Sequence, residues 1–267
     1  MNSNVMEPTV ADVLREALAA ADDGSFVVAP DVETVKRLIQ IVDNASPSVH
    51  LLAEPAALKA VMDEFLLASR AADHVEAGIL DIRSYEEVTN VLVVTDEAVV
   101  AVVRADEHVA GLTTNDGAFV ESANARFAEA WRNAAPYALK TPPLSTVRET
   151  LETELGARTA EDFDTMLAAL DADGGAAIDE VTVSLLVAAR NEALLYDISK
   201  WGEDVGIASK ATFSRTKTRL EEQGLIETEK VPIDVGRPRL RLKLGDERLR
   251  NLDAEEFARV ARSMLAT

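Results

Sequence analysis

"SKATFSRTKTRLEEQGLIETEKV", residues 209–231, contains a complete helix and the start of a strand. Ser209 is of the type that caps helix N-termini, and Gly224 is of the type that ends helices. Phe213 and Leu220 are seven residues apart, so they share a face that we expect to be buried. The opposite face, near the helix N-terminus, carries short hydroxyls and cations. It comprises Lys210, Thr212, Ser214, Arg215 and Thr218, with Arg219 further along.

This polar face suits contact with a DNA duplex. Forked guanidiniums and short hydroxyls are the groups that a helix in the major groove uses to read base edges. Hydroxyls near a helix N-terminus, such as that of Ser209, can also hold phosphates. The sequence therefore predicts a DNA-contacting helix over residues 210–223.

The residues after this helix predict a basic hairpin. "ETEKVPIDVGRPRLRLKLG", residues 227–245, contains two extended segments around a turn at 234–236. Basic and leucine side chains alternate along the second segment, so they project from opposite faces. A basic face of this kind can follow phosphates or enter a minor groove. Its members are Arg237, Arg239, Arg241 and Lys243.

Two helices are predicted upstream. Asp179 is expected to be the N-cap of a helix over 180–191, and a second helix is expected over 194–204. Gly202 and Gly206 fit the need for a small residue where two helices touch and a flexible residue in the turn. Residues 179–250 therefore predict an α+β winged helix-turn-helix domain.

The stretch 208–245 resembles the winged-helix half of haloarchaeal regulators, and the layout of the whole chain is similar to their TbsP-like family. The resemblance implies a transcription regulator whose partner is double-stranded promoter DNA, often as a homodimer. Two residues depart from the usual pattern. Gly202 stands where family members usually have Ala, and Lys217 stands where winged helices commonly have Leu.

The first 140 residues predict an α/β domain for sensing or dimerisation. Helices and buried strands alternate in βαβ-like units, and three Val-rich runs then form an antiparallel meander. A helix over 117–135 should cover the sheet, with Phe119, Phe127 and Trp131 on its inner side. The expected strands are 25–29, 48–53, 77–82, 91–95, 98–104 and 108–113. Asp31 is expected to cap a helix that runs through residue 42, and Pro55 is expected to open a helix over residues 56 to about 72.

The pair Pro142-Pro143 predicts a domain seam, since it fits neither a helix nor a central strand. A helical linker is expected over 141–178, with Thr159 as an N-cap and a loop at 171–175. A terminal helix is expected within 251–267, from a capping box at Asp253. Its apolar stripe could serve the monomer core or a dimer interface, and the sequence leaves both open.

The acidic composition does not exclude nucleic acid as a partner. The net charge is -20, with 47 acidic and 27 basic residues, a balance typical of haloarchaeal proteins that stay hydrated in concentrated salt. Residues 207–243 nevertheless hold 9 Lys and Arg against 5 Asp and Glu. This basic island lies on the predicted DNA-binding segment.

Several other classes are disfavoured. The chain has no cysteine, no long apolar stretch and no signal-like N-terminus, so we expect a cytoplasmic protein without a membrane partner. No catalytic motif is found, and we expect no enzyme activity, metal or organic cofactor. Two alternatives stay open: an acyltransferase- or hydrolase-type enzyme with an accessory winged helix, and a winged-helix scaffold that binds protein. Asp81, Arg83 and Ser84 are weighed as a site for a small-metabolite effector or as simple turn formers.

Overall fold

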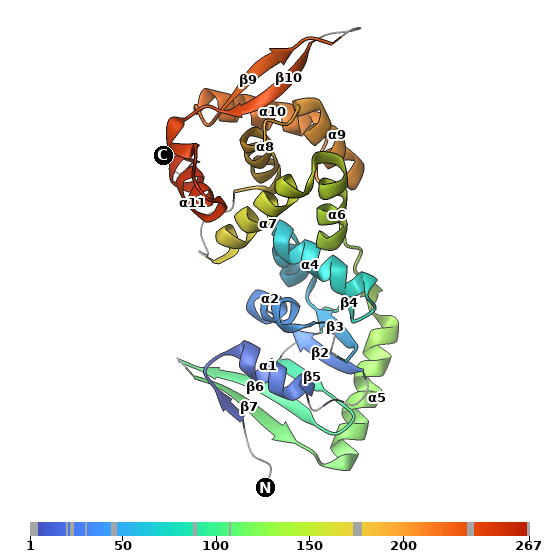
Figure 1. The fold of residues 1–267 in the computed structure, drawn as a ribbon. Coiled ribbons are helices and arrows are strands. Elements are labelled where there is room, and N and C mark those ends of the chain that lie inside the picture. Colours follow the sequence, from blue (N-terminus) through green and yellow to red (C-terminus); the bar gives the residue numbers. More distant parts are fainter. Residues whose placement is uncertain are drawn as a thin grey trace. The chain divides into compact units, whose positions relative to one another are not determined.

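The computed structural model describes residues 5–19, 21, 24–29, 31–43, 47–87, 90–106, 108–172, 178–233 and 238–265. The chain divides into two compact units, Met1–Pro143 and Leu144–Thr267. Figure 1 shows both units as ribbons. The prolines at 142 and 143 stand at the division.

One mixed sheet forms the centre of the N-terminal unit, in the order β1-β7-β6-β5-β2-β3-β4-β8. Strands β2, β3 and β4 are parallel, and every other neighbouring pair is antiparallel. The α/β prediction of βαβ-like units followed by a meander is confirmed. The strands are β1 (Val5–Glu7), β2 (Ser25–Ala29), β3 (Val49–Ala53), β4 (Leu80–Ser84), β5 (Val91–Val94), β6 (Val99–Ala105), β7 (His108–Thr114) and β8 (Ala135–Pro136).

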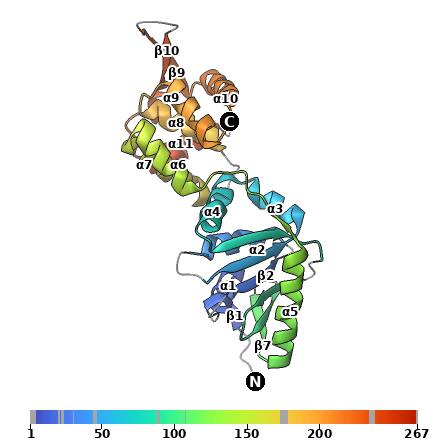
Figure 2. The ribbon, with the colours of Figure 1, turned by 90° about the vertical axis from the view of Figure 1, so that its right-hand side faces the viewer.

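Helices cover both faces of this sheet. In Figure 2, α5 lies on one side and α1 and α2 lie on the other. On the side of α1 and α2, Leu14 and Leu38 pack with strand residues such as Leu51. On the side of α5, Phe127 packs with Leu52. The helices are α1 (Val10–Ala19), α2 (Val32–Ile41), α3 (Pro55–Met62), α4 (Phe65–Glu76) and α5 (Gly117–Asn133).

Two helix predictions in this unit were wrong in detail. The single helix expected from Pro55 to about residue 72 is two helices, because the chain leaves helical geometry at Glu64, whose ψ is 107°. Phe119 was expected on the inner side of α5 but is 55% exposed. Val120 takes the buried position instead, since it shares a face with Phe127.

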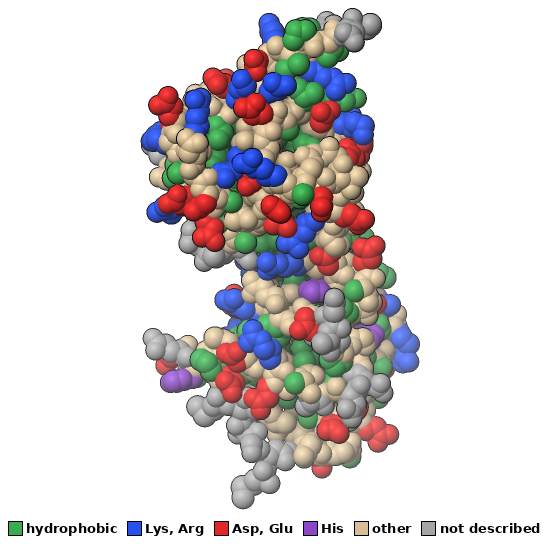
Figure 3. Space-filling model, viewed as in Figure 1, with side chains coloured by type: hydrophobic (Ala, Val, Ile, Leu, Met, Phe, Trp, Pro, Cys, Tyr) green, Lys and Arg blue, Asp and Glu red, His purple; other side chains and the backbone are tan. Residues whose placement is uncertain are grey.

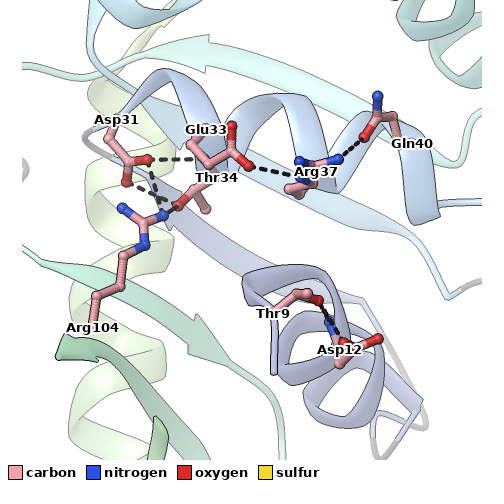
Figure 4. A network of polar contacts seen from close by, with 8 residues as sticks. All are labelled: Thr9, Asp12, Asp31, Glu33, Thr34, Arg37, Gln40 and Arg104. Carbon is pink, nitrogen blue, oxygen red and sulfur yellow. Dashed lines mark hydrogen bonds and ion pairs between the residues drawn. The ribbon is translucent and has the colours of Figure 1, made fainter. Parts of the chain in front are cut away.

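A polar network fixes the start of α2 to the sheet (Figure 4). Asp31 caps the helix by accepting a hydrogen bond from the backbone N–H of Thr34, as predicted. Arg104 of β6 reaches the carboxylate of Asp31 at 3.1 Å and the hydroxyl of Thr34 at 2.9 Å. Burial raises the pKa of Asp31, but the bonds from Thr34 and Arg104 outweigh it and lower that pKa overall.

The C-terminal unit is a winged helix enclosed by extra helices. Leu194 bridges to Arg241, so β10 is bordered by β9 and by the residue just before α9. The order of helices and strands from α8 to β10 is the one predicted. The elements are α6 (Leu144–Leu155), α7 (Ala157–Ala172), α8 (Glu180–Arg190), α9 (Leu195–Val205), α10 (Lys210–Glu222), β9 (Ile226–Val231), β10 (Arg239–Leu244), the 3-10 turn η1 (Glu247–Leu249) and α11 (Ala254–Leu265).

The residues expected as a helical linker, 141–178, belong largely to the core of this unit. Val147 and Leu151 of α6 and Phe163 of α7 are at most 1% exposed. The indole N–H of Trp201 in α9 donates to the hydroxyl of Thr150 in α6 at 3.0 Å. Helices α6 and α7 are therefore structural parts of the winged-helix unit, because their apolar side chains are buried in its core.

Four smaller expectations concern this unit. Thr159 is not an N-cap but lies inside α7, where its hydroxyl donates to the carbonyl of Leu155. Of the loop expected at 171–175, residues 171 and 172 are helical and 173–175 lie outside the described residues. The turn at 234–236 also lies outside them. In α11, Phe257 and Ala261 are buried within the unit, so its apolar stripe serves the core.

Candidate nucleic-acid interface

The turn between α9 and α10 depends on two glycines. Gly206 ends α9 with φ at +93°, a conformation that side chains other than glycine rarely adopt. At Gly202 an added Cβ would lie 2.3 Å from the Phe213 ring. Here the departure from alanine has a physical reason, because the missing methyl group leaves room for the ring. Phe213 is fully buried and fixes the spacing of the two helices.

Helix α10 presents the polar face that the sequence predicted. Ser209 is its N-cap, and the Ser209 hydroxyl accepts the backbone N–H of Thr212 at 3.2 Å. The Thr212 hydroxyl is within 3.1 Å of the Ser209 hydroxyl and is half-buried. The exposed side chains of the predicted set on this helix are Ser209, Lys210, Ser214, Arg215, Thr218 and Arg219.

Arg215 is the predicted cation on α10 that keeps its charge available. It is exposed, and it donates to a neutral group, the Thr212 hydroxyl, at 3.3 Å. Among the described residues, no carboxylate lies within ion-pair distance of it. Ser214 immediately precedes Arg215 and Thr218 follows it by three residues, and both side chains are exposed beside it, so the three form one stripe of the helix.

Two other cations of α10 have structural partners. Arg219 donates to the Thr182 hydroxyl at 2.8 Å and to the Asp179 carboxylate at 3.3 Å, so it joins α10 to the start of α8. The Lys217 side chain is only 14% exposed, and its ammonium lies 2.6 Å from Glu221. Lys217 thus covers the edge of the core with its stem, as its position in place of leucine suggested.

Lys210, at the start of α10, is paired with a carboxylate of α9. Its ammonium lies 2.6 Å from Glu203, whose carboxylate also accepts the backbone N–H of Lys210 at 3.2 Å. These bonds lower the pKa of Glu203 and raise that of Lys210. A phosphate that approached Lys210 would compete with Glu203 for the same ammonium.

The hairpin of β9 and β10, which we call the wing, carries cations and carboxylates on one face. Cross-strand pairing sets Arg241 opposite Glu229 and Lys243 opposite Glu227. The Lys243 ammonium lies 2.8 Å from Glu229, whose pKa is lowered by this contact, and Arg241 lies 3.9 Å from the same carboxylate. The expectation of a wholly positive surface is therefore corrected. Figure 3 shows blue and red side chains interspersed over the C-terminal unit.

Arg239 is held on the face of an aromatic ring. Its guanidinium carbon lies 4.3 Å from the centre of the Tyr196 ring, and one nitrogen lies 3.4 Å from Asp197. Both partners belong to the first turn of α9. The side chain of Arg239 remains 38% exposed, so it can still meet a ligand. Arg237, predicted beside it, lies outside the described residues.

A hollow of about 370 Å³ joins the helix to the wing. It brings together three predicted residues, Lys210, Ser214 and Arg239, from two elements distant in the sequence. Tyr196 and Ile233 also line it, are 47% and 40% exposed, and were not predicted. The inner face of α9, set by Leu195, Ile198 and Trp201, would have indicated that Tyr196 points outward. The other lining residues are Leu195, Ser199, Pro238 and Leu240.

In the N-terminal unit, Arg83, one of the three residues weighed as an effector site, has a structural partner. Asp81, Arg83 and Ser84 lie within β4 rather than after it. Arg83 donates to the Trp131 carbonyl at 2.7 Å and stacks 4.5 Å from the centre of that ring. The His50 ring meets the same indole edge-on at 4.6 Å, and burial lowers the pKa of His50. These contacts attach α5 to the sheet.

Over the described parts of the chain, no group of three or more His, Asp and Glu side chains is arranged to hold a metal ion. Within the same residues, no helix is long and apolar enough to cross a membrane.

Two family profiles match the chain, "Transcriptional regulator TbsP-like, N-terminal" over residues 2–142 and "Transcriptional regulator TbsP-like, C-terminal HTH domain" over residues 143–262. A comparison with curated proteins gave no match. Among solved structures, TrmBL2, an archaeal chromatin protein with a novel mode of DNA binding, is 18% identical with a TM-score of 0.38. That match covers 51% of this chain and 54% of TrmBL2, about half its length.

Nuc from Salmonella typhimurium, a phospholipase D family member, is 11% identical with a TM-score of 0.35, and the match covers 51% of this chain and 99% of Nuc. Both TM-scores are too low to carry an argument about fold or function. The family profiles together cover nearly the whole chain, and the second of them falls on the winged helix described above. The chain therefore belongs to the TbsP-like family of transcriptional regulators, and it is a DNA-binding transcription regulator.

Proposed function

We propose that this regulator recognises promoter duplexes by placing α10 in the major groove while the wing contacts the flanking backbone. The observation that carries this proposal is Arg215, an exposed guanidinium on a stripe of hydroxyls, with no carboxylate partner in the part of the chain that the structure describes. The hollow beside that stripe connects it to Arg239 of the wing. Arg215 is suited to base edges, whereas Lys210, Arg239 and Arg241 are suited to phosphates.

The charge balance of the surface indicates what kind of recognition to expect. Three cations near the proposed duplex already form ion pairs within the chain. The pairs are Lys210 with Glu203, Arg239 with Asp197 and Lys243 with Glu229. Exchange of a carboxylate for a phosphate releases fewer counterions than capture of a free cation would. Base-edge contacts and shape must then supply more of the affinity. This suits a protein of net charge -20 from a haloarchaeon, working in concentrated salt in the cytoplasm.

The experiment measures binding of the full chain to genomic promoter fragments in molar KCl. Arg215→Ala should weaken specific binding by about 10- to 100-fold and reduce discrimination between sites, because a bidentate base contact is lost. Arg239→Ala should weaken binding to all sequences more evenly. The matched control is Arg259→Ala, which removes an exposed arginine from α11. If Arg215→Ala and Arg239→Ala both bind as wild type does, this surface is not the interface.

In this proposal the protein acts as a homodimer on paired half-sites. The N-terminal unit pairs the copies and responds to a small metabolite, and the protein is not an enzyme. A genome-wide occupancy map provides the test. A recurring motif with two half-sites upstream of related genes is expected, whereas a single unpaired motif would contradict the dimeric form.

A further inference from the structure

One half of a sheet face in the N-terminal unit is apolar and uncovered. Helix α5 covers β2, β3, β5 and the first residue of β6, and the apolar cluster beneath it contains no described residue of β7. Beyond that cluster, Val103 of β6 is 43% exposed and Leu112 of β7 is 46% exposed. In Figure 1 the β6–β7 hairpin extends away from α5. Phe119, in α5 on the same side of the sheet, is a third large apolar side chain left exposed.

The register of the strands shows which side chains share this face. Ala101 pairs with Leu92 and Leu112, and Val103 pairs with Ala110, so these residues point to one side. None of the positions on this face is Asp, Glu, Lys or Arg, although such residues make up 28% of the chain. We call it the uncharged face. It comprises the positions beyond the part that α5 covers, namely Ala101, Val103, Ala105, His108, Ala110, Leu112 and Thr114.

Strand β6 contains one charged residue, Arg104, and its side chain points the other way. Arg104 follows Val103 and reaches Asp31 and Thr34 on the opposite side of the sheet (Figure 4). That opposite side is covered, because Val100 and Val109 belong to the apolar core with α1 and α2. The same two strands thus bury one face within the monomer and present a second apolar face to solvent. Exposed apolar patches of this kind usually mark an interaction surface.

We propose that the uncharged face is the surface through which two copies of this chain pair, sheet against sheet. The charge distribution of the N-terminal unit indicates that the partner on this face is a second copy of the chain. Residues 1–143 contain 23 Asp and Glu against 10 Lys and Arg, so two copies repel each other over most of this unit. On the uncharged face that repulsion is absent. A two-fold interface uses the same patch twice, and a flat uncharged patch is complementary to itself.

This inference deepens the proposed function, because it assigns the surface that pairs two DNA-binding copies. The first test measures the mass of the full chain in molar KCl without DNA. Wild type should be a dimer, and Leu112→Glu should weaken dimerisation by ~100-fold or more, since two carboxylates would be buried across the two-fold axis. Val75→Glu is the matched control, because Val75 is 40% exposed on α4 away from this face. Thermal unfolding checks that each variant is folded.

A second test does not depend on a disruptive substitution. The chain has no cysteine, so one introduced thiol can be cross-linked only to another copy. Ala101→Cys, Val103→Cys and Leu112→Cys are treated separately with a short bismaleimide, and Val75→Cys is the control. Cross-linked dimers from the face variants but not from Val75→Cys are expected. A monomeric wild type, a dimer that survives Leu112→Glu, or equal cross-linking at Val75 would overturn the inference.

The two proposals can fail separately. A monomer whose promoter binding is still lost on Arg215→Ala would remove the pairing surface and leave the proposed function intact. A dimer that Leu112→Glu dissociates, but that binds no promoter fragment, would support the pairing surface and remove the proposed function.

Discussion

The ammonium of Lys210 lies 2.6 Å from the carboxylate of Glu203, so the first cation of the proposed recognition helix is already neutralised by its own chain. The same is true of Lys243 in the wing, at 2.8 Å from Glu229. The protein therefore offers DNA a surface of exchangeable ion pairs, with Arg215 as its unpaired exception among the cations described on α10.

Glu203→Gln should tighten promoter binding by about 2- to 5-fold, because Lys210 then meets phosphate without giving up a carboxylate. The dependence of affinity on salt should also become steeper by about one counterion. Fluorescence anisotropy at several KCl concentrations measures both effects. Glu255→Gln on α11 is the control, since it removes one exposed negative charge from the same unit. Equal or weaker binding by Glu203→Gln would show that Lys210 does not meet phosphate.

Tyr196→Ala should lower DNA affinity by about 2- to 5-fold, because the ring that holds the Arg239 guanidinium at 4.3 Å is removed. Tyr196→Phe keeps the ring and should bind nearly as wild type does. The pair of variants separates stacking from any hydrogen bond by the phenol. Comparable losses in both variants would assign the effect to the hydroxyl and not to the stack.

Gly202→Ala should destabilise the C-terminal unit by about 1–3 kcal/mol, because the added methyl group overlaps the Phe213 ring and the core must shift. The chain has two tryptophans, so Trp131→Phe leaves Trp201 fluorescence to report on this unit during urea unfolding. In that background, Phe213→Leu should recover part of the loss when combined with Gly202→Ala. Additive destabilisation by the two substitutions would contradict the proposed overlap.

Glu180 should make the C-terminal unit less stable as the pH rises. Burial, followed by the nearby Asp179 charge, raises its pKa above 4.5, so the folded state binds its proton more tightly than the unfolded state does. This contribution is present at low pH and is lost as the pH rises through the raised pKa. Glu180→Gln should therefore raise the melting temperature at neutral pH, and the gain should shrink as the pH falls through the raised pKa and be absent below the ordinary glutamate pKa.

Melting curves at a series of pH values provide the measurement for Glu180. Glu255→Gln is again the matched control, because Glu255 also lies in the first turn of a helix but is exposed. A gain in Glu180→Gln that does not depend on pH would point to a cause other than titration.

Local sequence signals predicted three helix caps and the turn between α9 and α10, although the cap expected at Thr159 was wrong. Asp31, Asp179 and Ser209 all cap helices, because an N-cap bond joins residues only three apart. Gly206 takes the left-handed conformation that the turn needs. Such contacts depend on neighbours along the chain, which the sequence shows directly.

The charge state of the candidate site could be predicted only in part. The cross-strand pairing of Glu229 with Arg241 follows from the alternation in residues 227–231, so the sequence did contain this signal. The ion pairs of Glu203 with Lys210 and of Asp197 with Arg239 could not be predicted from such a pattern. The distances within these pairs depend on how α9 packs against α10 and β10, which is a tertiary property.

The hydrogen bond from the Trp201 indole to Thr150 bears on how this protein can be dissected. A fragment cut at the usual borders of a winged helix, near residues 179 and 250, would lack the Thr150 acceptor of the indole N–H. It would also expose the apolar surface of Trp201 that Phe163 now covers. A stable fragment of the C-terminal unit should therefore begin at α6.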